Sequence, residues 1–264
     1  MEGQGQLFDP DKLNASQFPV QDGVHKAASR YMEGEGLGQY TPPATDKQVD
    51  PQRGFAQYKA YEKAQGEPET PTIRGSYEAL RQGVHKQFDY ITRPEAEGGM
   101  GVTVESKKDD PYGLGWAGGT DTTARQNMET DFNENKRMQV MSTGENPGQS
   151  HAYFSDEEND KFRAVHDVFG HIGTGSSFSR NGEEAGFESH KQMFPPEAHE
   201  ALTSETRGQN SYLNYGNKGF PDQGEKLVGL PAWASETGRL NLPAGSLNKS
   251  RTGNRGRQER LFES

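Results

Sequence analysis

The sequence predicts a mainly α-helical protein with a few short strands, an α+β chain with long loops and extended terminal arms. In several segments apolar residues recur at three- and four-residue steps, the period of a helix with one buried face. Only 29% of the 264 residues are hydrophobic, and the chain contains 33 glycines and 15 prolines. This composition is too polar for one compact core of that length, so we expect part of the chain to be arm or loop.

We divide the chain into an extended N-terminal arm at residues 1–71, a helical domain at 72–240 and a basic C-terminal tail at 241–264. The arm has two short apolar faces, at residues 24–31 and 55–61, which we expect to dock on a surface. The tail is basic because two glutamates face five cations, Lys249, Arg251, Arg255, Arg257 and Arg260. Such a tail could contact nucleic acid or an acidic neighbouring subunit.

The predicted elements of the domain begin with a helix over Thr72–Thr92, whose apolar residues include Tyr77, Leu80 and Val84. A loop-rich stretch follows, and we predict a short strand at 101–104, a helix at 123–136 and a strand at 138–141. The next helix starts at Ser155, because Ser155 and Glu158 fit a capping box.

The helix after Ser155 carries the most informative residues of the chain, His166 and His171. His166 follows Phe162 by four residues, so it falls on the buried stripe, where an imidazole needs partners for its nitrogens. On an ideal helix His171 would point about 140° away from His166. Gly170 can end the helix or distort its last turn and let His171 swing back. We therefore predict that both histidines bind one metal.

A third ligand must come from another segment, and we rank Glu205 first. Pro195 and Pro196 open a helix that continues through Leu213, and Glu205 lies in its apolar row, where an unpaired carboxylate is costly to bury. The alternative carboxylates are Glu183 and Glu184, on the preceding segment. A salt bridge from Glu205 to Arg207 or Arg163 is the competing explanation.

Four further residues could hydrogen-bond to the ligands: Asp167, Arg207, Gln209 and His151. His151 could also be a fourth ligand, a proton carrier or an exposed loop histidine. The chain has no cysteine, so His, Asp and Glu are the strong ligands left. This donor set suits iron, manganese or zinc.

The order of these residues resembles the iron-binding core of the aromatic amino acid hydroxylases, which carry a His-Glu-x-x-Gly-His helix and a later Thr-x-Glu. The similarity covers about residues 138–215, with His166-Asp167-Val168-Phe169-Gly170-His171 followed by Thr203-Ser204-Glu205. It implies an Fe(II) site of His166, His171 and Glu205 in a non-haem oxygenase. Asp167 stands where that family has glutamate. No pterin-binding segment is found, so pterin is not expected.

A second resemblance is to a domain of bacteriophage-encoded proteins, several of them particle-associated. It is carried by residues 162–167, 182–184, 192–194 and 203–216, and extends from the helix of Tyr77 to Trp233. It implies a viral origin. The alternative function is therefore a virion component, capsid- or tail-associated, whose arms contact other copies of the chain or other virion proteins. We expect it in the virion or the host cytoplasm.

Charge and hydropathy exclude several other classes. The net charge of −10 argues against a general binder of nucleic acid or anionic membranes, so only the tail is expected to contact nucleic acid. No apolar run approaches the ~20 residues of a membrane span, and no signal peptide opens the chain. No residue pattern identifies a small-molecule substrate.

Overall fold

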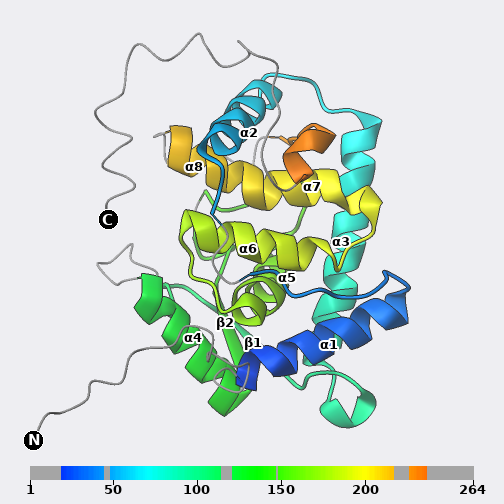
Figure 1. The fold of residues 1–264 in the computed structure, drawn as a ribbon, viewed down its shortest axis with the longest axis vertical. Helices are drawn as coiled ribbons and strands as arrows, with labels where there is room; N and C mark the ends of the chain where they lie inside the picture. The colour runs from blue at the N-terminus through cyan, green and yellow to red at the C-terminus, as the bar shows by residue number, and fades with distance from the viewer. Residues whose placement is uncertain (1–18, 45–47, 114–120, 147, 217–225, 237–264) are drawn as a thin grey trace, which may run out of the picture.

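The computed structural model describes residues 19–44, 48–113, 121–146, 148–216 and 226–236. Within these ranges the protein is mainly helical with two short strands, which confirms the predicted mainly α class (Figure 1). The helices are α1 (Pro19–Glu35), α2 (Pro51–Ala64), α3 (Pro71–Thr92), α4 (Asp121–Asn135), α5 (Asp156–His166), α6 (Arg180–Lys191), α7 (His199–Thr203) and α8 (Gln209–Gly216). Two π-helical turns, η4 (Asp167–Ile172) and η6 (Ser204–Gly208), and three 3₁₀ turns, η3 (Glu95–Glu97), η5 (Pro196–Ala198) and η7 (Ala232–Ser235), accompany them.

Helix α3 runs along one side of the molecule and packs against α5 and α7 (Figure 1). Its start is encoded locally, because the Thr70 side chain accepts a hydrogen bond from the N–H of Ile73 and Pro71 occupies the first turn. Tyr77, Leu80 and Val84 are buried. The predicted helix over 72–92 is thus confirmed, one residue longer at its start.

The strands β1 (Thr103–Lys107) and β2 (Arg137–Met141) pair in parallel, from Thr103 beside Arg137 to Lys107 beside Met141. The predicted strand at 101–104 starts two residues too early. Gly101 has a φ of 66°, outside the extended region, and the N–H of Val102 bonds back to Ile91. The extended ladder therefore begins only at Thr103.

The predicted extended arm at 1–71 is corrected for the described residues 19–44 and 48–71. Helix α1 buries Val24, Ala27, Ala28 and Tyr31 in the main hydrophobic core and packs on η4. Helix α2 packs along α8. Both helices belong to the same folded unit as the described residues after 71. The predicted boundary at residue 71 therefore does not divide an arm from a domain. Residues 1–18 and the predicted basic tail at 241–264 lie outside the described ranges.

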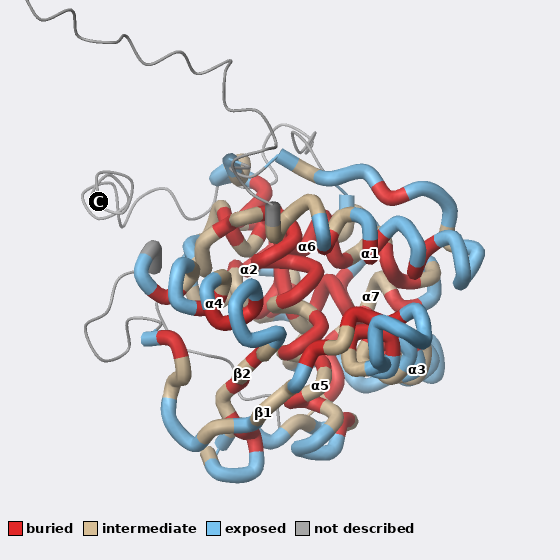
Figure 2. Tube along the Cα trace, turned by 90° about the horizontal axis from the view of Figure 1, so that it is seen from below, coloured by how far each residue is buried: buried red, intermediate tan, exposed pale blue. Residues whose placement is uncertain are grey.

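The main core lies where α6 crosses η4, between α3 on one side and α1 and α4 on another (Figure 1). Buried residues run through α6, whereas α3 turns an exposed face outward (Figure 2). A second cluster joins α2 to the segment 226–236 through Tyr61, Val228, Leu230 and Ala234. None of the helices in the described ranges combines the length and hydropathy that crossing a bilayer requires.

Candidate metal centre

His166 and His171 are brought together by the π-helical turn η4, which continues α5 without a break. In a π turn the backbone hydrogen bonds span five residues, and here the N–H of Gly173 donates to the carbonyl of Val168. Residues five apart therefore lie one above the other. The two imidazole rings have centroids 5.1 Å apart and stand edge to face. The predicted distortion near Gly170 is confirmed, although the helix widens rather than ends.

Gly170 also allows α6 to cross η4 closely at Gly186. A Cβ at residue 170 would lie 3.3 Å from both the Cα and the carbonyl oxygen of Gly186, tighter than most real contacts. It would also lie 3.3 Å from Cε1 of His166. Because neither glycine has a side chain, the α6 backbone approaches the histidines and brings its own side chains to them.

Glu183, in the first turn of α6, reaches both histidines. Its Oε2 lies 3.6 Å from Nε2 of His166, and its Oε1 lies 3.5 Å from Nε2 of His171. One ligand atom from each residue lies within 4.8 Å of the others, and we call this group the three-ligand cluster. Ligands bound at right angles to one metal are about 3 Å apart. The carboxylate-to-imidazole distances thus need to shorten by only about half an ångström.

The three-ligand cluster has an electrostatic preference for positive charge. Burial alone would raise the pKa of the Glu183 carboxyl, but His171 and His166 hold it well below its usual range. Burial would lower the pKa of His171, but Glu183 and Asp167 raise it above its usual value. Burial likewise raises the pKa of Asp167, which lies beside the cluster. A divalent cation would replace the proton that His171 otherwise attracts.

Glu205, which the sequence analysis ranked first as third ligand, lies in a different cluster. Its carboxylate accepts hydrogen bonds from the Tyr77 hydroxyl and from Nε2 of Gln209, at 2.5 Å, and lies 3.2 Å from Nε2 of His151. Burial opposes its charge, yet His151 and the hydrogen bonds hold its pKa below the usual value. The ranking of the carboxylates is therefore corrected: Glu183, an alternative, adjoins both histidines.

His151 is not exposed, and it contacts Glu205 rather than belonging to the three-ligand cluster. Its side chain is 2% exposed, and its Nδ1 accepts hydrogen bonds from the N–H groups of Tyr153 and Phe154 at 2.9 and 3.1 Å. Nε2 must then carry the proton that faces Glu205. His151 and Gln209 were predicted to support the metal ligands. The structure places both of them beside Glu205 instead.

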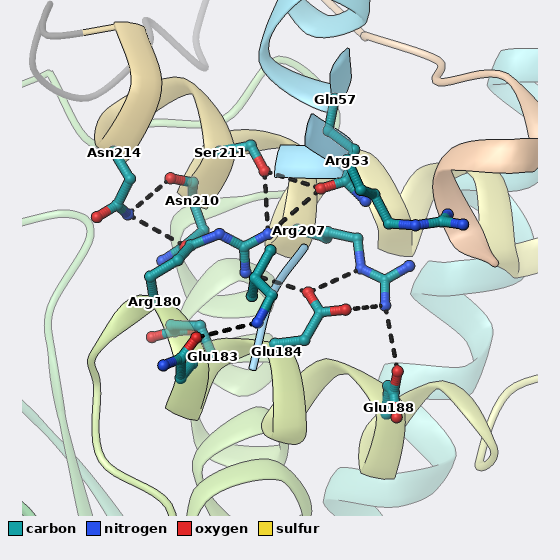
Figure 3. Close-up of polar contacts among 12 residues, drawn as sticks. Arg53, Gln57, Arg180, Glu183, Glu184, Glu188, Arg207, Asn210, Ser211 and Asn214 are labelled. Carbon is teal, nitrogen blue, oxygen red and sulfur yellow. Dashed lines mark hydrogen bonds and ion pairs between the residues drawn. The ribbon is translucent and has the colours of Figure 1, made fainter. Parts of the chain in front are cut away.

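Glu184, the other alternative carboxylate, points toward Arg207 and Arg180 (Figure 3). Two nitrogens of Arg207 donate hydrogen bonds to the Glu184 carboxylate, at 3.1 and 2.5 Å. The Arg207 guanidinium lies 4.0 Å from the Phe187 ring centroid. Arg207 also donates to the carbonyls of Ala234 and Glu236, which ties the segment 226–236 to α6. Arg207 therefore supports this packing rather than the metal ligands.

Arg163, the other proposed partner of Glu205, donates instead to the carbonyl of Met141 and to Oε1 of Gln149. The salt-bridge explanation for Glu205 is thus wrong for both arginines.

His190 lies directly behind His166 and is not among the site residues predicted from the sequence. The two Nδ1 atoms are 3.3 Å apart, and His190 is fully buried. A signal was present in the sequence: Glu183, Gly186 and His190 recur at three- and four-residue steps, so they share one face of α6. That face packs on η4.

Two imidazoles and one carboxylate on one side of an ion leave its other coordination positions free, the arrangement found in non-haem iron enzymes. Comparison of the chain with protein-family models, curated proteins and solved structures gives no match. The chemistry of the three-ligand cluster must therefore be inferred from its own residues.

Proposed function

We propose that the protein binds a divalent metal through His166, His171 and Glu183. One observation carries this proposal: the π turn places the two histidines side by side, so that a single carboxylate reaches both. Two nitrogen ligands and one oxygen ligand without a thiolate suit Fe(II) best, with Zn²⁺ and Mn²⁺ as the other candidates.

The reaction class that best fits this donor set is a non-haem Fe(II) oxygenase. Iron held on one face would supply the activation of dioxygen next to a bound substrate. The three-ligand cluster has an open side, since the side chains of His166 and Glu183 are 12% and 21% exposed whereas that of His171 is 1% exposed. A hydroxylase-like core is part of this proposal, with Glu183 in the place that the resemblance gave to Glu205.

Metal analysis of protein purified without added metal tests the proposal. We expect close to one iron, zinc or manganese per parent chain and a large loss in His166→Ala, His171→Ala and Glu183→Ala, because each removes a ligand. Glu205→Gln is the matched control, a buried carboxylate outside the cluster, and should keep the parental metal content.

Two results would contradict the assignment. A Glu183→Ala protein that holds as much metal as the parent would exclude Glu183 as a ligand. A parent chain that stays metal-free after incubation with Fe(II), Zn²⁺ and Mn²⁺ in turn would exclude the metal centre.

A structural role in a virus particle is a second candidate, compatible with a metal centre. It is supported by the resemblance to the phage-encoded domain, whose shared residues lie mostly on α5, α6 and the α7–η6–α8 segment. Proteomics of purified particles would test it, because a virion component must be present in every preparation.

A further inference from the structure

A buried row of polar groups extends from His166 away from the three-ligand cluster. Nδ1 of His166 lies 3.3 Å from Nδ1 of His190, and Nε2 of His190 lies 2.6 Å from Oε1 of Gln87. The row ends where Nε2 of Gln87 donates to the carbonyl of Met193, at 3.0 Å. His190 and Gln87 are both fully buried, on α6 and α3.

The direction of each hydrogen bond in this row follows from its last member. The Met193 carbonyl can only accept, so the amide nitrogen of Gln87 faces it and the amide oxygen faces His190. That oxygen also only accepts, so Nε2 of His190 carries a hydrogen. The proton positions are thus set by a backbone carbonyl distant from the cluster.

The position of the hydrogen on His190 in turn determines which nitrogen of His166 carries a hydrogen. A doubly protonated imidazole is costly to bury without a carboxylate, and the described residues place none in hydrogen-bond contact with His190. Neutral His190 with its hydrogen on Nε2 has a lone pair on Nδ1, which accepts from Nδ1–H of His166. The remaining nitrogen of His166, Nε2, is then the one that faces Glu183 and would bind a metal.

We propose that Gln87 and His190 are positioning residues that hold His166 in its Nδ1–H tautomer, with Nε2 ready to bind a metal. We call the row from Gln87 through His190 to His166 the relay. Its role in metal binding rests on the proposed metal centre, but the Nδ1–H tautomer of His166 does not require a bound metal. Partners that orient a ligating histidine in this way typically change metal affinity 10- to 100-fold when they are lost. The relay also gives a reason for a fully buried glutamine on the apolar face of α3.

The test is nitrogen-15 NMR of the full, metal-free chain with labelled histidines, because the two neutral tautomers have distinct ring-nitrogen spectra. We expect His166 to be protonated on Nδ1 in the parent. Gln87→Met removes the acceptor at similar length, so His190 and His166 should shift toward the opposite tautomers and metal should bind 10- to 100-fold more weakly. Gln87→Glu, protonated in this buried place, can accept from His190 and donate to Met193, and should restore both.

His199→Asn is the control, since the His199 ring hydrogen-bonds to the Phe194 carbonyl outside this row and its loss should leave the His166 spectrum unchanged. A parent His166 protonated on Nε2 but not on Nδ1 would overturn the relay, and this measurement does not depend on any variant folding. An unchanged His166 spectrum in folded Gln87→Met would also overturn it. The expected spectra without any metal binding would support the relay and contradict the metal centre, so the two failures are distinguishable.

Discussion

Glu183, Glu184 and Glu205 are partly or fully buried carboxylates with different partners, and the partners decide what each can do. Arginines neutralise Glu184, whereas hydrogen-bond donors from three side chains stabilise the charge of Glu205. Glu183 faces two imidazoles, whose nitrogens can bind a metal. The sequence indicated that buried carboxylates must be compensated, but not by which groups, because those partners lie on segments distant along the chain.

The dependence of stability on pH can test how the charge of the Glu158 carboxylate is compensated. Burial would raise the pKa of this carboxyl, but hydrogen bonds from His85, Ser155 and Arg81 lower it to about 2. Its contribution to stability is therefore present above its unfolded pKa of about 4.5 and is lost as the pH falls toward 2. Relative to Glu158→Gln, the parent should be more stable by about 1–2 kcal/mol at pH 6.

Urea unfolding of both proteins from pH 6 to pH 2.5 measures this difference, which should shrink steadily with acidification. Glu157→Gln is the control, because the side chain of the neighbouring Glu157 is 80% exposed and should change little. A parent–variant gap that does not depend on pH would contradict the assigned role of Glu158.

Some features of the helices are predicted by local sequence motifs, whereas others depend on contacts between distant segments. Helix α5 begins at Asp156 because Ser155 and Glu158 form both hydrogen bonds of a capping box, a purely local motif. The π turn that follows is different. Gly170 marked a weak point in the helix, but the widening itself accompanies the packing of α6 at Gly186.

Gly170→Ala should test this packing. The added Cβ would press on the Gly186 backbone and on His166, so we expect a destabilisation of roughly 1–3 kcal/mol and weaker metal binding. Gly75→Ala is the matched control in the interior of α3, where nothing lies within 4 Å of the new Cβ. It should stabilise the protein by up to about 1 kcal/mol.

Chemical denaturation of the two variants gives both free energies of unfolding, and metal analysis gives the second readout. If Gly170→Ala matched the parent in stability and metal content, close contact at residue 170 would not be what shapes the three-ligand cluster.

At the scale of the whole molecule, the described N-terminal helices complete the core. Low hydrophobicity suggested arms, but α1 buries Ala27 and Ala28 in the main core, and the helix packs on the π turn. Glycine is not counted among the hydrophobic residues, yet it permits tight contacts, as Gly170 and Gly186 do. Composition therefore underestimated how much of the chain is folded.

Ala27→Asp tests whether α1 belongs to the folded unit. Ala27 is buried in the main core, so an unpaired carboxylate there should destabilise the whole protein by more than about 3 kcal/mol. Ser29→Asp, at an exposed position of the same helix, should cost no more than about 0.5 kcal/mol. A thermal melt monitored by far-ultraviolet circular dichroism compares them, and equal melting temperatures would indicate that α1 is a dispensable arm.

The sequence by itself determined the helical class, the starts of α3 and α5 and the two histidines, because capping, periodicity and residue chemistry act over a few positions. Only the tertiary structure decided that Glu183 joins the histidines and that His190 stands behind His166. Those choices depend on the angle and closeness at which α6 crosses η4, a packing outcome between segments that no local pattern encodes.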